Sequence, residues 1–327
     1  MKSVSLWVGV KSHSKQYMLR PIKNLSYEEI EKILLENDKR VVFEKTNVVP
    51  DETTLHNELD KYIDYDAISR NTVLGIDIYQ YSSYTEFKQT LIPYLFKKMF
   101  ELSAELCMRN HPYIFQSYNK SVFEERFIST GDGGFLILDT PMHALLFAAN
   151  FAVVLRVYNS FNLFPRLRKI IGGLTMRYAI TYDKIYYFDK NYYGRAIINN
   201  ARILMKDELN RCLIDEHVHT WFTTNIGGLE SLQVLTIEDI ANIYEFKENY
   251  DDSFLEKADP IFGGTISREK GIINSDILKI GKIQSKETGL TIYNLHLQVS
   301  IWLNNDDHPE QKKLITISLG NLNTSGI

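Results

Sequence analysis

The stretch RFISTGDGGFLIL, from Arg126 to Leu138, decides the fold that the sequence predicts. Within it, two β-rich runs flank Gly-Asp-Gly-Gly, and glycines tolerate the positive φ angles of a tight turn. The stretch therefore predicts a β-hairpin that holds Asp132 at its tip. A single Asp in a glycine-rich turn is most often a turn former, so a functional role for Asp132 needs other residues that point to the same chemistry.

A second carboxylate, Asp77, has a similar position upstream. The run VLGIDI, from Val73 to Ile78, reads as a short buried strand with Asp77 near its end. Two strand-end carboxylates side by side form an oxygen-rich site that suits Mg²⁺ or Mn²⁺, and such sites bind phosphates. Ser83 to Glu86 then has the spacing of a capping box, and the free N–H groups of a helix N-terminus can hold phosphate oxygens. The same residues also fit a buried strand followed by a well-capped helix without a ligand.

Composition narrows the class of protein. The chain has 327 residues, enough for about two domains, and its net charge of -4 gives no reason to expect a nucleic-acid or membrane surface. Two cysteines, Cys107 and Cys212, are too few for a disulfide framework and fit a reducing compartment. The best apolar run, Ala144 to Val154, is too short to span a bilayer. We therefore expect a cytoplasmic protein that binds neither nucleic acid nor membrane.

Residues 71–235 read as strand, helix, two strands, helix, two strands, helix and strand. After the first strand, the sequence predicts a long helix from Thr85, a helix from Met142 to Tyr158 and a helix from Ala196 to Asp207. The later strands are predicted at Gly173 to Ile180, at Ile185 to Phe188 after a turn at 182–184, and at Val218 to Thr223. This order predicts an α+β fold, with a mixed sheet of the ferredoxin-like or palm type and helices on one face. Such a sheet puts Asp77 and Asp132 on neighbouring central strands.

Three further segments surround this unit. Residues 1–70 predict an N-terminal extension, with a hairpin over 4–19 and helices over 26–36 and 52–63. Residues 236–262 read as a helix and an acidic linker. Beyond 263, the polar and apolar alternation from Tyr293 to Leu303, with a partner at Leu314 to Leu319, predicts a small β-rich C-terminal domain. By its position and strand pattern this domain resembles a sensor domain.

Residues 71–235 resemble the catalytic domain of class III nucleotidyl cyclases in three segments. GIDIYQYSSY, from Gly75 to Tyr84, resembles the metal and phosphate segment of that family, and STGDGG, at 129–134, resembles its Gly-Asp hairpin. YYGRAIINNARI, from Tyr192 to Ile203, resembles its Gly-x-x-x-Asn-x-x-x-Arg helix start. The resemblance covers about half of the chain and implies that the chain is an enzyme, a nucleotidyl cyclase.

The resemblance also implies roles for individual residues. Asp77, Asp132 and the Ile78 carbonyl would hold two divalent metal ions, Mn²⁺ or Mg²⁺, and Tyr81 and Ser82 lie in the segment that contacts the substrate. Arg202, eight residues after Gly194, would neutralise the transferring phosphoryl group, although an arginine on a solvated helix face is an equally good interpretation. In the family, the metal-binding Asp residues come from one chain and the base contacts and arginine from the other, which implies a homodimer with composite active sites.

The chain departs from the family pattern at the positions that contact the nucleoside. Ile198 stands where the helix asparagine is expected, with Asn199 one place later; Ile128 replaces a lysine that selects adenine, and Asn191 replaces its acidic partner. An aliphatic side chain and an amide cannot pair with a purine edge as a lysine and an acid do. Asn191, helped by Arg126 or a nearby tyrosine, is therefore our candidate for recognition of a pyrimidine.

These departures make the chain resemble the pyrimidine cyclases of bacterial Pycsar antiphage defence. That resemblance implies conversion of UTP to 3′,5′-cyclic UMP and pyrophosphate, as a second messenger read by a cyclic-nucleotide effector protein. Three alternatives stay open: a cytidylate cyclase that uses CTP, an adenylate or guanylate cyclase with an unusual pocket, and a catalytically degenerate sensor that only binds nucleotide.

Overall fold

The computed structural model of the chain describes residues 31–32, 52–60, 69–188, 190–229, 232, 271–284, 289–303 and 313–327. The helices of eight or more residues are α2 (Glu52–Asp60), α3 (Glu86–Asn110), α5 (Pro141–Asn159), α7 (Arg195–Lys206) and α8 (Glu216–Ile226). The shorter helices are η2 (Tyr81–Ser83), α4 (Lys120–Glu125) and α6 (Pro165–Ile171). The strands are β1 (Arg70–Ile78), β2 (Phe127–Ser129), β3 (Gly133–Leu138), β4 (Met176–Phe188), β5 (Asn191–Gly194), β6 (Cys212–Asp215), β7 (Gly271–Gln284), β8 (Gly289–Leu303) and β9 (Lys313–Leu319).

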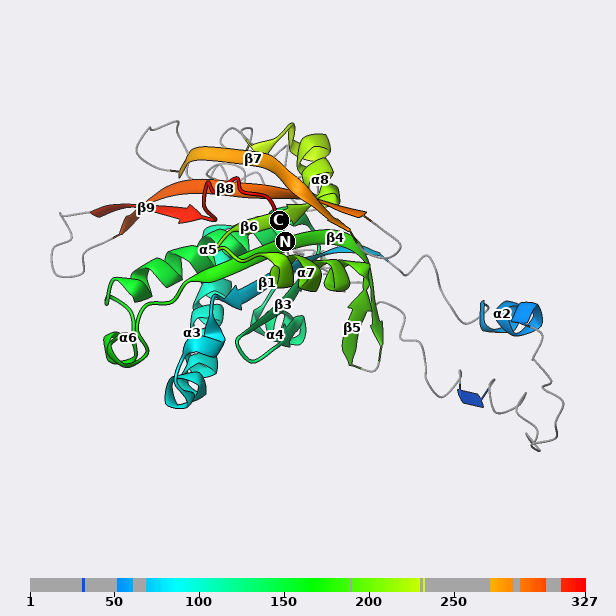
Figure 1. Ribbon diagram of the computed structural model, residues 1–327, viewed down its shortest axis with the longest axis horizontal. Helices are drawn as coiled ribbons and strands as arrows, with labels where there is room; N and C mark the ends of the chain where they lie inside the picture. Colours follow the sequence, from blue (N-terminus) through cyan, green and yellow to red (C-terminus); the bar gives the residue numbers. More distant parts are fainter. Residues whose placement is uncertain are drawn as a thin grey trace, which may run out of the picture.

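One nine-stranded sheet organises these elements (Figure 1). Its main order is β2-β3-β1-β4-β6-β8-β7, while β5 pairs with β4 and β9 pairs with β8. β4 and β6 run parallel, and the other paired strands run antiparallel. The sheet is therefore mixed and the fold is α+β, which confirms the predicted fold class.

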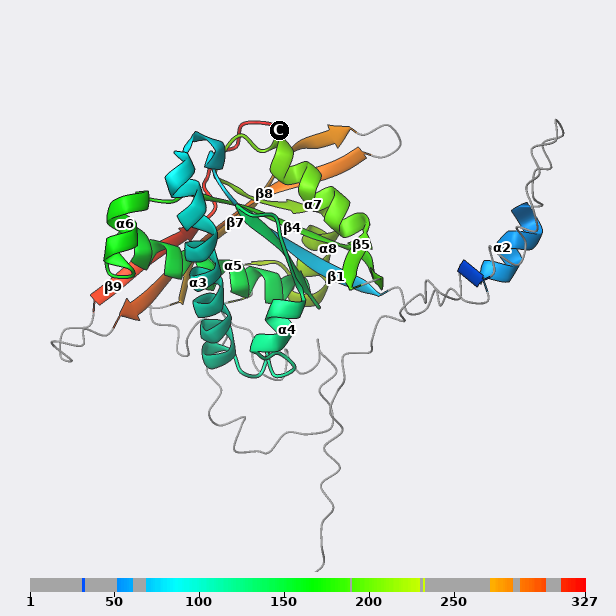
Figure 2. The same cartoon turned by 90° about the horizontal axis from the view of Figure 1, so that it is seen from below.

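The strand β1 has apolar side chains on both faces of the sheet, and both faces are covered. Leu74 and Ile76 face the large core under α3, α5 and α8, and α3 and α5 lie side by side over this face (Figure 2). Val73 faces the other way and packs with Ala196 of α7. Side chains alternate along a strand, so an unbroken apolar strand needs cover on both sides. The prediction of helices on one face is thus corrected for α7, which lies on the opposite face.

The strands beyond residue 263 continue the same sheet. β8 pairs with β6 through Cys212 opposite Leu295 and Asp215 opposite Ile292, and β7, β8 and β9 follow in orange to red in Figure 1. β6 has only four residues, and the pairing with β8 covers an edge that would otherwise expose backbone groups. The predicted strand over 293–303 and its partner at 314–319 are confirmed as β8 and β9. The prediction that they form a separate small domain is corrected by this pairing.

Two of the predicted strand assignments were wrong. β4 runs without a break from Met176 to Phe188, so the turn expected at 182–184 does not form. The segment Val218 to Thr223 is helical, as part of α8, because the Asp215 carboxylate accepts a hydrogen bond from the Val218 amide at 2.9 Å and caps the helix. The strand of this region is β6, which ends at Asp215.

The other predicted helices stand as follows. Those at 142–158, 196–207 and 52–63 correspond to α5, α7 and α2. The long helix predicted from Thr85 corresponds to α3, and its buried side includes Ile92 and Phe96. The hairpin over 4–19, the helix over 236–248 and the linker after it lie outside the described residues, as does the helix over 26–36 apart from residues 31–32.

α5 is the most apolar of the described long helices. By length and composition it could cross a membrane, with a mean hydropathy of 1.4, but 78% of that window is buried inside the protein. Its residues pack against α3 and the sheet, as the contact between the Phe151 and Phe96 rings at 5.5 Å shows. α5 is therefore the central helix of the core.

Candidate active site

The β2–β3 hairpin carries Asp132 to the end of β1. Asp77 of β1 lies opposite Gly133 of β3, and the Ile78 amide donates a hydrogen bond to the Asp132 carbonyl at 3.2 Å. A Cβ on Gly133 would lie 2.0 Å from the Ile76 carbonyl oxygen, so this approach of two backbones requires glycine. The turn also needs glycine at Gly131, whose φ is +98°. The sequence prediction that the two carboxylates lie on neighbouring strands is confirmed.

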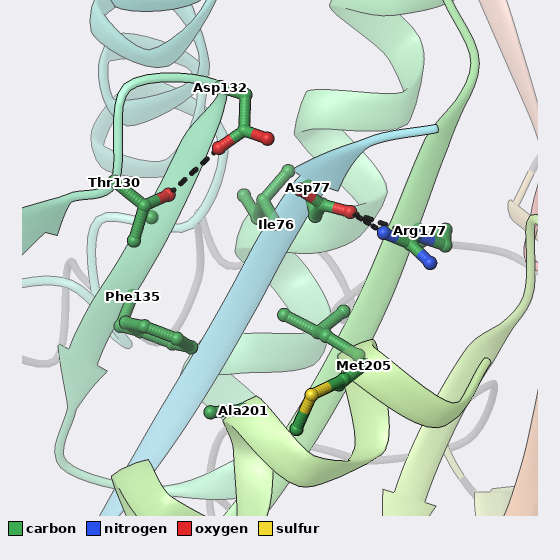
Figure 3. Close-up of a pocket in the computed structure, with 10 residues that line it drawn as sticks. Ile76, Asp77, Thr130, Asp132, Phe135, Arg177, Ala201 and Met205 are labelled. Carbon is green, nitrogen blue, oxygen red and sulfur yellow. Dashed lines mark hydrogen bonds and ion pairs between the residues drawn. The ribbon is translucent and has the colours of Figure 1, made fainter. Parts of the chain in front are cut away.

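A pocket of about 240 Å³ opens beside these carboxylates (Figure 3). Its polar part comes from Asp77, Asp132, Thr130 and Arg177, the last on β4. Its apolar part is formed by Ile76, Gly134, Phe135, Ala201, Leu204 and Met205. The pocket thus combines two acids and one base on one side with an apolar wall, built largely by α7, on the other.

Arg177 is the counter-ion of Asp77. Its Nε donates to Asp77 Oδ2 at 2.8 Å, Nη2 contacts the same oxygen, and Nη1 donates to the Asp207 carbonyl at 2.6 Å. Burial raises the pKa of Asp77, the Arg177 pair opposes that rise, and the neighbouring Asp132 carboxylate adds to it. Two acids share one cation here, so further positive charge would stabilise the ionised site.

The two carboxylates fit a hard divalent cation. Mg²⁺ is usually bound through one or two carboxylates, with water and substrate phosphate completing its shell. Among the described residues no group of three or more His, Cys, Asp and Glu side chains could hold a metal ion. Any metal bound by Asp77 and Asp132 would therefore take its other ligands from backbone carbonyls, such as that of Ile78, from water or from a bound phosphate.

The part of the predicted metal and phosphate segment that follows β1 does not line the pocket. Tyr81 and Ser82 belong to the 3-10 turn η2, where the Tyr81 hydroxyl donates to the Gln89 carbonyl at 3.0 Å and Ser82 is exposed. Thr85 is the N-cap of α3, and no side chain caps it, so the capping box expected from Ser83 to Glu86 does not form. The contacts of Tyr81 and Ser82 with a substrate remain predictions.

The α7 residues predicted to act in catalysis are not among those that line the Asp77 pocket. Ala201, Leu204 and Met205 line it, whereas Arg202 and Asn199 are half-buried on another part of the helix surface, near Ile198, whose exposed fraction is 51%. Within one chain, Arg202 and Asn199 are therefore not brought to the two carboxylates.

The neighbouring Asn200 has a structural role that the sequence did not indicate. It is fully buried, and its Nδ2 donates to the carbonyls of Val73 and Ala179, each at 2.8 Å. These bonds tie α7 to β1 and β4. Gly75 makes room for them, because a Cβ there would lie 2.0 Å from Asn200 Oδ1. The signal that could have identified Asn200 is its helical spacing from Ala196, Ile203 and Leu204, which places it on the buried stripe of α7.

The residues predicted to read the base lie away from this pocket. Ile128 of β2 is half-buried and packs in a cluster with Ile137 and Tyr192. Asn191 is exposed at the start of β5, where its Oδ1 accepts from the Tyr192 amide at 2.9 Å. Tyr192 thus links the two predicted positions, but neither Ile128 nor Asn191 lines the space beside Asp77.

Arg126 was the predicted helper for base recognition, and the structure gives it intramolecular partners. Its Nη1 lies 2.7 Å from Asp139 Oδ1 and 3.3 Å from the Tyr118 hydroxyl, and its guanidinium lies over the Tyr118 ring. The nearby Asp139 and Tyr118 help to hold the pKa of Arg126 above its usual range despite burial. These contacts give Arg126 a structural role at the start of the hairpin.

Arg177 was missed from the sequence. It lies 100 positions after Asp77, and only the antiparallel pairing of β1 and β4 sets the two residues opposite each other. The signal that could have identified it is a charged residue between the buried residues Met176 and Tyr178 at the start of β4. A charge in such a place requires a partner.

The chain matches no protein-family model and no curated protein. Among solved structures, it is similar to an adenylate/guanylate cyclase/hydrolase from Silicibacter pomeroyi, with 13% identity, coverage of 69% of this chain and 96% of that chain, and a TM-score of 0.36. It is also similar to the adenylyl cyclase CyaB from P. aeruginosa, with 10% identity, coverage of 69% and 94%, and a TM-score of 0.39. A third is the catalytic core of a rhodopsin-guanylyl cyclase with converted specificity, with 9% identity, coverage of 71% and 97%, and a TM-score of 0.39. At these identities and TM-scores, the similarities assign no function to the chain.

Proposed function

We propose that the chain is a metal-dependent nucleotidyl cyclase that works as a homodimer and converts UTP to 3′,5′-cyclic UMP and pyrophosphate. The observation that supports this most directly is the pairing of β1 with the β2–β3 hairpin, which sets Asp77 and Asp132 at one pocket with Arg177. Two acids and a guanidinium on adjacent strands suit a polyphosphate with its cations. The segments that resemble class III cyclases contain both acids.

In this reaction the ribose 3′-oxygen attacks the α-phosphorus, the hydroxyl proton is lost, and the bond to pyrophosphate breaks. Positioning and charge stabilisation supply most of the rate of such phosphoryl transfers. Asp77 and Asp132 would hold divalent metal ions, which when bound neutralise phosphate charge and favour ionisation of the attacking hydroxyl. Arg177, which faces the same pocket, would bind the anionic oxygens of the triphosphate.

The size of the pocket favours a site completed by a second chain. About 240 Å³ lies below the roughly 300–1,000 Å³ of pockets that enclose a ligand of drug size. The space beside Asp77 would thus take part of a nucleotide, while Arg202 and Asn199 lie outside it. In a homodimer these α7 residues, with Asn191 and Ile128, would contact the nucleotide held by the partner's carboxylates.

Ile128 and Asn191 favour a pyrimidine base. Neither side chain carries a charge, so together they cannot offer the charged pair that reads a purine edge. Asn191 is exposed, and its amide can donate and accept toward a uracil or cytosine edge. UTP is the preferred substrate and CTP the next; a cyclic pyrimidine product would then act as an antiphage signal through a cyclic-nucleotide effector protein.

Incubation of the purified protein with ATP, GTP, CTP and UTP, in Mn²⁺ and in Mg²⁺, tests the proposal when products are resolved by mass spectrometry. Cyclic UMP is the expected product, and Asp132→Ala should abolish it without changing the circular dichroism spectrum. Cyclic AMP or cyclic GMP would overturn the assignment of the base. Binding of nucleotide without pyrophosphate release, for all four substrates and both metals, would favour the degenerate sensor.

Mixing two inactive variants tests the composite site. Asp132→Ala lacks a metal ligand and Arg202→Ala lacks the proposed phosphoryl contact, so each homodimer should be inactive. After exchange of subunits, half of the dimers are mixed and each has one intact site of two, which predicts about a quarter of the wild-type activity. No recovery, under conditions where labelled chains do exchange, would contradict a site shared between chains.

A further inference from the structure

The segment 320–327 folds back across the sheet beside the C-terminal end of α7. It begins at Gly320, whose φ is +73° and whose Cβ position would lie 2.5 Å from the Leu295 carbonyl oxygen. Asn294 of β8 then donates to the carbonyls of Asn321 at 2.8 Å and Asn323 at 3.1 Å. Asn321 in turn donates to Asn210 Oδ1 at 2.8 Å. The segment is thus hydrogen-bonded to β8 and to the loop between α7 and β6.

A buried ion pair connects this segment to the end of α7. Arg211 and Asp207 each have an exposed fraction of 1%, and Arg211 Nε donates to Asp207 Oδ1 at 2.8 Å. Arg211 Nη1 donates to the Ser325 carbonyl at 2.7 Å. A buried guanidinium stabilises a fold only when its donors are satisfied, so the Ser325 carbonyl is part of what holds Arg211 in place.

Asp207 connects this ion pair to the candidate active site. It caps α7, with its amide bonded to the Ile203 carbonyl at 2.9 Å, and its own carbonyl accepts from Arg177 Nη1 at 2.6 Å. The opposite edge of the Arg177 guanidinium contacts Asp77. A continuous series of hydrogen bonds therefore runs from Ser325 through Arg211, Asp207 and Arg177 to Asp77.

We infer that the segment 320–327, through the Arg211–Asp207 pair, positions the guanidinium of Arg177 for binding the polyphosphate of the substrate. Arginine has a long side chain with many rotamers, and fixed acceptors at Nη1 and at the edge that contacts Asp77 leave the remaining N–H donors of Arg177 in one orientation. The Asp207 carbonyl is the acceptor at Nη1, and its place depends on the loop that Arg211 and the segment hold. The inference rests on the proposed function, in that Arg177 contacts a polyphosphate. Arg211 and Asp207 are positioning residues that act through Arg177.

A double-mutant cycle between Arg211→Lys and Arg177→Met tests this positioning role. A lysine keeps the charge beside Asp207 but cannot bridge to the Ser325 carbonyl with the geometry of a guanidinium. Alone, Arg211→Lys should raise the Kd of inorganic tripolyphosphate and the KM of the nucleotide about tenfold, with a smaller change in kcat. In the Arg177→Met background, the same substitution should change neither quantity, because the group that it positions is absent.

Two further variants serve as a substitute for Arg211→Lys and as a control. Asn321→Ala loosens the segment from Asn210 at a half-buried surface position, and serves if Arg211→Lys does not fold. Arg168→Lys is the matched control, since Arg168 also donates to a carbonyl, that of Asn159 at 3.2 Å, but does not line the pocket. Arg168→Lys should leave tripolyphosphate affinity unchanged.

The binding arm separates failure of this inference from failure of the proposed function. If the wild-type protein makes no cyclic product but binds tripolyphosphate through Arg177, the proposed cyclase activity is wrong. The double-mutant cycle on tripolyphosphate affinity then still decides whether Arg211 positions Arg177. Equal losses of affinity from Arg211→Lys in both backgrounds would overturn the inference and leave a purely structural role. The inference would also be overturned if tripolyphosphate did not bind at all, or if its binding did not depend on Arg177.

Discussion

Gly75→Ala should weaken the attachment of α7 to the sheet through the addition of a single methyl group. The added Cβ would lie 2.0 Å from Asn200 Oδ1 and 2.7 Å from Leu204 Cδ1, so the Asn200 amide must move. It would then lose its 2.8 Å bonds to the Val73 and Ala179 carbonyls in a fully buried place. Overpacking typically costs about 1–3 kcal/mol, and leaving a buried polar group unpaired costs about 1–3 kcal/mol.

Together these costs give a loss of about 3 kcal/mol in the free energy of unfolding when part of the strain is relieved by movement of Leu204. For a unit of this size the melting temperature should fall by about 6–12 °C, since each kcal/mol corresponds to roughly 2–4 °C. Thermal unfolding followed by circular dichroism measures the change. Gly173→Ala is the control, because its Cβ would meet only the end of the Arg168 side chain at 3.1 Å and Asn159 Oδ1 at 3.4 Å. A melting temperature of Gly75→Ala equal to that of Gly173→Ala would refute the reasoning.

Three further outcomes are expected. Mn²⁺ at about one hundred times its Kd should raise the free energy of unfolding by about 2.7 kcal/mol, and the rise should vanish in the Asp77→Asn and Asp132→Asn double variant; a rise that persists would place the metal elsewhere. Burial raises the pKa of Asp215 to about 7, above the roughly 3.9 of an unfolded aspartate. Between these two values the folded state holds a proton that the unfolded chain releases. The free energy of unfolding should therefore fall as the pH rises from about 4 to about 7. When the free energy of unfolding is measured in urea at several pH values, it should fall less with pH for Asp215→Asn than for the wild type. An equal fall would contradict Asp215 as the source. Tyr193 stacks on Tyr186 at 5.8 Å with an exposed fraction of 40%, so Tyr193→Asp should increase the monomer fraction in sedimentation velocity if a partner chain covers this hairpin, and an unchanged dimer would exclude that surface.

Local sequence determined the elements that carry the two acids. The glycines around Asp132 permit a hairpin whose turn has a positive φ at Gly131, and the apolar run before Asp77 forms a central strand. Both depend on interactions within about ten residues, so the pattern of residue types suffices to predict them. The start of α7 at Arg195 follows in the same way from the chain around Gly194.

Sequence prediction failed in two places. Val218 to Thr223 has the β-branched and aromatic residues of a strand, but Asp215 three positions earlier caps a helix, a local signal that the prediction missed, and Phe222 is buried in the core. The strands after residue 263 alternate like those of an independent module, and only the free edge of β6 draws β8 into the main sheet.

The sequence by itself thus determined the hairpin, the first strand and the pair of carboxylates that they bring together. Only the tertiary structure decided that Arg177 completes the pocket, that Asn200 bonds the Val73 and Ala179 carbonyls, and that the segment 320–327 reaches the end of α7. The physical reason is that these contacts join residues far apart in the chain, from 21 positions for Asn200 and Ala179 to 127 for Asn200 and Val73. Such pairs depend on which strands and helices lie side by side in the fold, and the residues around each member of a pair do not specify that.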